Sequence, residues 1–431
     1  MGNYTKQDII QLVEEKDVQF IRLQFTDVSG TLKNVAITAS QLEKALDNKC
    51  MFDGSSIEGF VRIEESDMYL YPDLNTFEIL PWRPQHGKVA RFMCDVYRPE
   101  GVPFEGDSRY VLKNVLKKAA KMGYTFDVGP ECEFFLFHTD DNGQPTNITH
   151  EKASYFDVTP LDLGENARRD IVLTLESMGF EIEASHHEVA PAQHEIDFKY
   201  TDALHTADNI ETFKLVVKSI AKRHGLHASF MPKPFKDCSG SGLKITLCIK
   251  KDDKSIFGTS HKDLTPEGRA FIAGILNRAR EFTMFSNPTI NSYDRFGYRA
   301  APSRINWSEE NRIPLVQLLY APGRDGSIEF RSADAYCNPY ITFQMLLSAG
   351  MAGIQNGEEL YDNMNAANEN SAIPTLPHSL EESIRLAQES DFVRSTVPEA
   401  ILHDFSAAMQ KEVDAYHLAK DPEAFCFERY F

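Results

Sequence analysis

Apolar and polar positions alternate with two different periods along the first hundred residues. Residues 6–15 carry their apolar side chains at helical spacing, whereas residues 18–25 (VQFIRLQF) alternate as a half-buried strand does. A turn signal at 27–30 ends this first strand. Further strands are expected at 31–38, 76–80 and 89–96. The pattern predicts a small unit that contains one or more helices and a sheet.

The rest of the chain mixes longer helical patterns with short strands. A linker is expected at 98–106 (RPEGVPFEG), where Pro and Gly interrupt the pattern. Helices are then predicted at 108–122, 167–178 and 208–224, strands at 131–137, 194–198, 243–249 and 327–331, and mainly helix over 340–431. Because most of these strands can pair antiparallel, we expect an α+β fold rather than a doubly wound parallel sheet. The predicted domains are 1–102 and 103–431.

Charge and composition exclude several classes of protein. The 431 residues include 45 Lys and Arg against 64 Asp and Glu, a formal charge of −19. This balance argues against nucleic-acid binding and against docking on an anionic membrane. No secretory signal, no 18-residue apolar run, no CxxC pair among seven cysteines and no common phosphate-binding glycine loop is found. We expect a cytoplasmic protein without structural zinc.

Two motifs bring carboxylates together. In GPECEFFLF (129–137), Glu131 and Glu133 are two residues apart, so on a strand they share one face. Two like charges in that position are unfavourable unless water or a cation separates them. The segment 186–195 (HHEVAPAQHE) adds Glu188, Glu195 and three histidines around a proline turn. Hard oxygen ligands favour Mg²⁺ or Mn²⁺ over zinc.

Other polar segments are ordinary loops when taken singly. Glu329 and Arg331 in SIEFR are either a surface ion pair or a metal ligand beside an anion-binding group. Taken together, however, the motifs resemble glutamine synthetase of the bacterial type I class over most of the chain. The matching segments are FDGSSIEGF (52–60), PFEGD (103–107), GPECEFFLF (129–137), HHEVAPAQHEIDF (186–198), FMPKP (230–234), NSYDR (291–295), WSEENR (307–312) and IEFR (328–331).

The resemblance implies a fold, an assembly and a reaction. The fold would be a small β-grasp-like N-terminal domain plus a large α/β catalytic domain with a curved antiparallel sheet. The family assembles as two stacked hexameric rings, with each site completed by the N-terminal domain of a neighbouring subunit. The implied reaction joins glutamate and ammonia with ATP as substrate, through γ-glutamyl phosphate. FVRIEESDM (60–68) resembles the short, feedback-inhibited subclass.

The resemblance also assigns roles to matching positions. One divalent metal, Mg²⁺ or Mn²⁺, would be held by Glu133, Glu188 and Glu195, and a second by Glu131 and Glu329. Glutamate would be bound by Arg295, Arg331, Ser239 and Gly240, and the nucleotide by Lys233, Tyr155 and Phe156. The transferring phosphoryl group would be stabilised by Arg312, ammonium would be bound and deprotonated by Asp53 and Ser56, and Arg62 would take part in inhibition by glutamine.

Several positions depart from the family pattern. Lys244 replaces the histidine that is the third ligand of the second metal, and an ammonium has no lone pair to give a metal. We expect it to lie between Glu131 and Glu329, leaving the second metal site empty or weak. The other departures are Ser239 for asparagine, Thr246 for histidine, Cys248 for serine, Gln317 and Ser327 for arginines, and Arg299 where the flap glutamate is expected.

These departures leave three functions open. The first is a glutamate–ammonia ligase. The second is a catalytically impaired paralogue that acts by binding or regulation. The third is a γ-glutamyl ligase for another amine, because Ser239 and the altered flap touch the substrate end.

Overall fold

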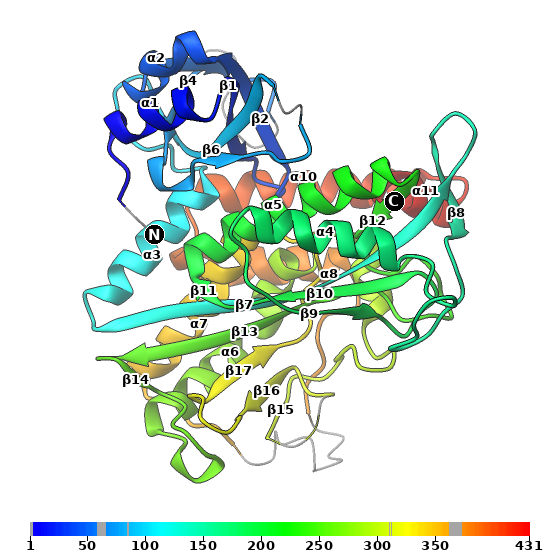
Figure 1. The fold of residues 1–431 in the computed structure, drawn as a ribbon. Coiled ribbons are helices and arrows are strands. Elements are labelled where there is room, and N and C mark those ends of the chain that lie inside the picture. The colour runs from blue at the N-terminus through cyan, green and yellow to red at the C-terminus, as the bar shows by residue number, and fades with distance from the viewer. Residues whose placement is uncertain (1–2, 58–65, 84–85, 310, 312, 362–372) are drawn as a thin grey trace.

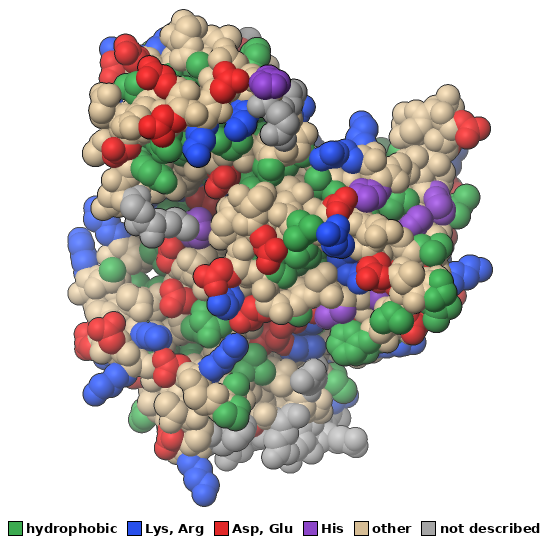
Figure 2. Space-filling view, viewed as in Figure 1, with side chains coloured by type: hydrophobic (Ala, Val, Ile, Leu, Met, Phe, Trp, Pro, Cys, Tyr) green, Lys and Arg blue, Asp and Glu red, His purple; other side chains and the backbone are tan. Residues whose placement is uncertain are grey.

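The computed structural model describes residues 1–431 except 1–2, 58–65, 84–85, 310, 312 and 362–372. The described residues form a small N-terminal part stacked on a larger one that is built around a long sheet (Figure 1). None of the helices in these ranges is long and apolar enough to cross a membrane. Acidic side chains are spread over the face seen in Figure 2 and mixed with lysine and arginine, so much of the charge excess is solvated surface.

The N-terminal part is a mixed sheet covered by a helix. Strands β1 and β6 pair parallel at its centre and the order is β2-β1-β6-β4-β3. Helix α1 begins at a capping box of Thr5 and Asp8 and buries Ile9 and Val13. The elements are α1 (Lys6–Glu15), β1 (Val18–Thr26), β2 (Leu32–Thr38), α2 (Leu42–Leu46), β3 (Cys50–Asp53), β4 (Asp67–Pro72), β5 (Glu78–Ile79) and β6 (Lys88–Tyr97).

One predicted strand is much shorter than expected. Of residues 76–80 only Glu78–Ile79 is strand, because Leu74–Thr76 forms a 3₁₀ turn. The Asp73 carboxylate accepts a hydrogen bond from the Asn75 backbone N–H at 3.3 Å and so caps that turn. Aspartate favours such local caps over a ladder, and the apolar pattern alone does not reveal this preference.

The larger part is built on an eleven-stranded sheet. Its main path is β15-β16-β17-β13-β7-β10-β9, and every pair is antiparallel except β15 with β16. The predicted antiparallel sheet is therefore confirmed. Its strands are β7 (Tyr124–Thr139), β8 (Pro145–Thr149), β9 (Ile182–His187), β10 (Gln193–Phe198), β11 (Thr201–Asp202), β12 (Leu226–Ser229), β13 (Leu243–Lys251), β14 (Lys254–Ser255), β15 (Trp307–Ser308), β16 (Val316–Leu319) and β17 (Ser327–Phe330).

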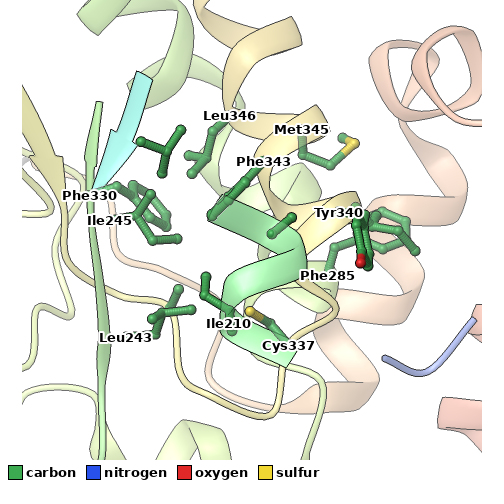
Figure 3. Close-up of a cluster of buried hydrophobic side chains, with 14 of the residues drawn as sticks. Ile210, Leu243, Ile245, Phe285, Phe330, Cys337, Tyr340, Phe343, Met345 and Leu346 are labelled. Carbon is green, nitrogen blue, oxygen red and sulfur yellow. The ribbon is translucent and has the colours of Figure 1, made fainter. Parts of the chain in front are cut away.

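Helices cover one face of this sheet and bury its apolar side chains. In Figure 3, Leu243 and Ile245 of β13 lie opposite Phe343 and Leu346 of α7, with Ile210 of α5 beside them. Alternate residues of the same strands point to the other face, where the polar side chains gather. The helices are α3 (Ser108–Ala120), α4 (Glu165–Ser177), α5 (Ala203–Arg223), α6 (Pro266–Ser286), α7 (Pro339–Asn356), α8 (Leu380–Glu389), α9 (Asp391–Thr396), α10 (Glu399–Leu418) and α11 (Pro422–Tyr430).

Helices α6 and α7 approach each other closely because glycine lies at their crossing. A Cβ on Gly274 would lie 2.2 Å from the Ala349 carbonyl oxygen, and one on Gly353 would lie 2.1 Å from that of Ala270. Only glycine permits this backbone approach. The crossing fixes the helical layer under the sheet.

A buried arginine joins the two parts of the molecule. Arg109, at the start of α3, donates to Asp95 at 2.6 Å and to Asp73 at 2.9 Å, both in the N-terminal part. It also donates to both oxygens of Asp208 on α5, at 2.9 and 2.8 Å. Tyr340 donates to the same Asp208 carboxylate at 2.6 Å. One guanidinium therefore fixes the orientation of the N-terminal sheet relative to α5.

The ion pair between Arg278 of α6 and Glu358, just after α7, makes part of the folding stability depend on pH. Arg278 donates to both oxygens of Glu358, at 2.6 and 3.0 Å, and these bonds lower the pKa of Glu358 from 4.5 to about 2. Because the folded pKa is the lower one, the stabilisation is complete above about pH 4.5 and is lost as the pH falls from there towards 2. We expect Glu358→Gln to lower the thermal midpoint at pH 7 and to have a smaller effect at pH 3.5. A difference in midpoint that is equal at both pH values would contradict this.

Candidate active site

The register of three strands places the acidic side chains on one face of the sheet. Glu131 of β7 lies opposite Asp197 of β10 on one side and Lys244 of β13 on the other. Glu133 lies opposite Glu195. Residues directly opposite each other have Cβ atoms roughly 4.5–5.5 Å apart, so these groups interact through their side chains. The predicted common face of Glu131 and Glu133 agrees with this register.

A first group of carboxylates converges where the 186–195 turn meets β7. The carboxylate of Glu133 accepts hydrogen bonds from the Gly242 backbone N–H at 2.7 Å and from Gln193 Nε2 at 3.3 Å. His186 lies 3.7 Å from Glu195 and 3.9 Å from Glu188. Burial and the neighbouring Glu133 charge raise the pKa of Glu188. The group therefore gains stability from a cation, and its oxygen-rich donor set fits a hard divalent ion.

Groups of acidic and histidine side chains that could hold a metal ion occur three times in the part of the chain that the structure describes. Within each group the ligand atoms lie within 4.8 Å of one another. They are His186, Glu188 and Glu195; Glu131, Glu195 and Asp197; and Glu151, His187 and His194. The first of these includes two of the three ligands predicted for the first metal.

The second predicted metal group has a different arrangement from the one expected. Lys244 Nζ donates to Glu131 at 2.7 Å and lies 3.1 Å from Glu195, so the predicted contact with Glu131 is present. The predicted position between Glu131 and Glu329 is wrong, because Glu329 is paired with Arg331 instead.

Strand register explains this correction. Lys244 lies directly opposite Glu131, whereas Glu329 lies opposite Thr246, one diagonal step away. A direct cross-strand neighbour is closer than a diagonal one by roughly 2–3 Å. The lysine therefore binds the neighbour that it faces. Arg331, just past the end of the strand that carries Glu329, neutralises Glu329.

The proposed glutamate-binding residues lie beside the first carboxylate group. Arg295 is buried and donates to the Ser332 carbonyl oxygen at 3.0 Å. A Cβ on Gly242 would lie 2.9 Å from Arg295 Nη2 and 3.5 Å from a Glu133 oxygen, and one on Gly240 would lie 2.0 Å from the Pro232 carbonyl oxygen. This loop therefore needs glycine for its close packing against the guanidinium.

Ser239 and Arg331 are the other two residues predicted to bind the substrate. Ser239 is half-buried, next to Gly240. Arg331 is buried, and its Nε has no hydrogen-bond partner among the residues that the structure describes. A guanidinium with a spare N–H is suited to bind an anionic group.

The residues predicted for the nucleotide lie in two places. Tyr155 and Phe156 are about half exposed, stack on each other at 3.9 Å, and pack edge-on against His186 at 5.6 and 4.7 Å between ring centroids. They form a rim beside the first carboxylate group. Lys233 is buried, donates to the Cys238 carbonyl oxygen and lies 3.4 Å from the Tyr298 ring centroid.

The ammonium residues lie in the N-terminal part. Asp53 ends β3 and accepts hydrogen bonds from Ser55, at 2.8 Å from the backbone N–H and 2.6 Å from the hydroxyl, which lower its pKa. Ser56 is exposed in the following turn. Within the described ranges, no hydrogen bond or ion pair joins either residue to the glutamates of the sheet. Arg62 and Arg312 lie outside the described residues.

Three of the remaining departures from the family pattern, Gln317, Ser327 and Thr246, lie around Glu329. Gln317 of β16 is buried directly opposite Glu329 of β17. Ser327 is the first residue of β17. Thr246 flanks Glu329 on the other side. Arg299 is exposed in a turn with φ of +50°.

Two residues near the site were not singled out from the sequence. Asp197 shares a face with Glu195, so the rule that paired Glu131 with Glu133 would have found it. His186 was noted only as one of three histidines, yet its register opposite Glu195 places it on the carboxylate face.

The other two histidines, His187 and His194, lie on the opposite face of β9 and β10 from the carboxylates. His187 Nε2 hydrogen-bonds Glu151 at 2.6 Å, and His194 Nδ1 hydrogen-bonds Arg168 at 2.9 Å. Both histidines are fully buried and alternate with the carboxylate-facing residues of β9 and β10. They fix the turn between these strands.

The fold thus combines a small mixed sheet with a larger, mainly antiparallel sheet that has an acidic face. A family model described as "Glutamine synthetase, beta-Grasp domain" matches residues 17–99, and one described as "Glutamine synthetase, catalytic domain" matches residues 105–430. The chain belongs to the glutamine synthetase family. The predicted family, the β-grasp domain and the curved catalytic sheet are thereby confirmed.

Curated relatives are similar over nearly the whole chain. A glutamine synthetase from Clostridium saccharobutylicum is 54% identical over 428 residues, covering 96% of this chain and 96% of its own. One from Staphylococcus aureus (strain Mu50) is 49% identical, covering 96% and 95%. A solved structure described as a GmaS/ADP complex has a TM-score of 0.86 at 28% identity and covers 96% and 97% of the two chains.

Proposed function

We propose that this protein joins glutamate and ammonia to form glutamine, with ATP as the second substrate and γ-glutamyl phosphate as the intermediate. The observation that carries the proposal is the meeting of Glu133, Glu188 and Glu195 beside the buried Arg295. This arrangement supports a cation-binding role for the carboxylates and a substrate-binding role for the guanidinium beside them. The similarity to proteins named glutamine synthetase over 96% of the chain supports the same activity.

The first carboxylate group would hold the divalent ion. Glu133, Glu188 and Glu195 offer only oxygen ligands, which suits Mg²⁺ or Mn²⁺. When bound, such an ion neutralises phosphate oxygens during phosphoryl transfer. The ADP named in the related solved structure supports a nucleotide at this site.

The protein's own residues would orient the substrates. Arg295 and Arg331 are the proposed partners of the glutamate carboxylate. Ser239 and Gly240, in the loop before β13, are proposed to bind the same substrate. Holding the γ-carboxylate in place converts its attack on ATP into an effectively unimolecular step. The remaining proposed roles are nucleotide binding by Lys233, Tyr155 and Phe156, phosphoryl stabilisation by Arg312, ammonium binding by Asp53 and Ser56, and feedback inhibition through Arg62.

The assembly is part of the proposal. Asp53 and Ser56 make no described contact with the glutamates of their own chain, which supports a site that a second copy completes. We propose the ring assembly of the family, two stacked hexamers, and the domain boundary at 102–103. A cytoplasmic location stays a prediction from the sequence.

Phosphate release tests the proposed activity. With purified protein, ATP and Mg²⁺, we expect phosphate to appear only when glutamate and ammonium are both present, and glutamine to form in equal amount. Reactions without glutamate, without ammonium, and with methylamine in place of ammonium are the controls.

Other results would favour the alternatives. Faster release with methylamine than with ammonium would favour a γ-glutamyl ligase for another amine. No release in any mixture, from protein that still binds ATP, would favour the catalytically impaired paralogue.

A further inference from the structure

The Lys244 side chain lies among several carboxylates on the face of the sheet that the helices do not cover. Its Nζ lies 2.7 Å from Glu131 Oε2, 3.1 Å from Glu195 Oε2 and 3.8 Å from Glu133 Oε1. These carboxylates come from β7 and β10, on the same side of the lysine-bearing strand β13. One ammonium therefore contacts or approaches three carboxylates at once.

The group formed by Glu131, Glu195 and Asp197 has the donor spacing of a metal site. Two of its three members, however, already accept hydrogen bonds from Lys244. A divalent ion bound to the same oxygens would lie beside a positive charge and would receive no lone pair from it. The lysine therefore takes the place where a cation would bind.

The two carboxylates expected to hold the second metal both have protein cations as partners. Glu131 is paired with Lys244, and Glu329 with Arg331. Burial raises the pKa of Glu131, but the nearby charges of Lys244 and Arg331 lower it below its usual value. Two negative charges and two positive charges thus balance within this group, and no charge remains for a divalent ion.

The first carboxylate group differs from the second in its partners. Glu133 accepts from the Gly242 N–H and Gln193, and Glu188 accepts from the Val189 N–H at 2.8 Å. These donors are neutral, so none of these hydrogen bonds links Glu133 or Glu188 to a positively charged group. Glu195, the third member of this group, accepts hydrogen bonds from Lys244, so the charges of Glu133 and Glu188 are the ones that remain for a divalent ion.

We propose that the Lys244 ammonium replaces the second divalent cation, so that each chain binds one divalent metal ion at this face and not two. The inference rests on the proposed function only for the assignment of the carboxylates to metal sites. It concerns metal binding in the absence of substrates, so it stands or falls separately from turnover.

Counting bound Mn²⁺ tests the proposal. In calorimetric titration of the intact protein with Mn²⁺, we expect one equivalent per chain, and in Lys244→His two equivalents. The electron paramagnetic resonance spectrum at saturation should show an isolated Mn²⁺ ion in the natural protein and a spin-coupled pair in Lys244→His.

Lys250→His provides the matched control. Lys250 lies on the same face of β13, where it pairs with Asp325 at 3.2 Å, but away from the glutamates. We expect it to leave the count at one. Glu131→Gln is the second variant, and it should also leave the count at one because Lys244, not a metal ion, is the partner of Glu131.

Three outcomes would overturn the inference. They are two tight equivalents in the natural protein, a single equivalent in a folded Lys244→His variant, and a count that falls when Glu131 becomes glutamine. If Lys244→His does not fold, the natural protein and Glu131→Gln still decide. Absence of glutamine formation combined with one bound Mn²⁺ would refute the proposed function and leave this inference intact.

Discussion

Glu133→Gln is expected to lower the rate of phosphate release by about 10²-fold or more and to weaken Mn²⁺ binding by a similar factor. Even partners in the second coordination shell of a metal typically contribute 10–100-fold to metal affinity or activity, so a direct ligand contributes at least as much. Glutamine has the same shape and its amide oxygen still accepts from the Gly242 N–H, which lies 2.7 Å from the native carboxylate. The substitution therefore removes charge and leaves the packing of β7 in place.

A matched control separates the charge at the site from charge in general. Glu183→Gln makes the same chemical change on β9, where Glu183 is exposed and lies 3.6 Å from Arg324. We expect activity and Mn²⁺ affinity within a factor of two of the natural protein, because exposed ion pairs contribute little. Equal activity in Glu133→Gln and Glu183→Gln would refute the role of Glu133.

Arg109→Met is expected to lower the free energy of unfolding by roughly 3–5 kcal/mol, the usual cost of removing one partner of a buried ion pair. The arginine is 3% exposed, and its removal leaves the buried Asp208 without the guanidinium that binds both of its oxygens, while Asp95 keeps Lys113 as a partner. Methionine fills similar space and supplies no donor. Urea unfolding followed by circular dichroism measures the loss.

The control for this substitution is Arg385→Met. Arg385 pairs with Glu389 at 3.0 Å on the exposed face of α8, so its loss should change the unfolding free energy by less than about 1 kcal/mol. We also expect the N-terminal part of Arg109→Met to be cleaved by protease before the rest. Equal stability of the two variants would show that the arginine does not hold the domains together.

Most of the fold could be predicted because local patterns agree with it. The alternation in 18–25 and the helical spacing in 6–15 correspond to β1 and α1. The antiparallel sheet followed from short strands between helices. The shortened strand at Glu78–Ile79 could not be predicted from apolar spacing, since the side chain of Asp73, and not hydrophobicity, starts the 3₁₀ turn that takes the place of its first residues.

The site could be predicted less completely, because cross-strand register is not a local property. The sequence shows that Glu131 and Glu133 share a face, and the structure agrees. It does not show that Lys244 lies directly opposite Glu131, or that Glu329 lies opposite Thr246 and so only diagonally from Lys244. The second partner of the lysine was therefore predicted wrongly. A side chain's nearest charge depends on how separate strands align.

The resemblance to a family identified the glutamates of the site but not which positively charged side chains neutralise them. Matching motifs identified the acidic positions, and an ion pair between Glu329 and Arg331 was one of two alternatives that the sequence left open, but the burial of this pair is seen only in the structure. Asp197 was missed although its spacing from Glu195 is the same as that of Glu131 from Glu133. For that residue the signal was present in the sequence.

A lysine at position 244 changes how the site depends on its surroundings. A metal ion at an acidic site is exchanged with solution, and its occupancy follows the concentration of free ions and the presence of chelators. The ammonium that lies 2.7 Å from Glu131 is covalently attached, and every copy of the chain carries it from translation onwards. EDTA cannot remove it and magnesium starvation cannot deplete it. This part of the charge balance is inherited with the sequence instead of being set by the ionic content of the medium.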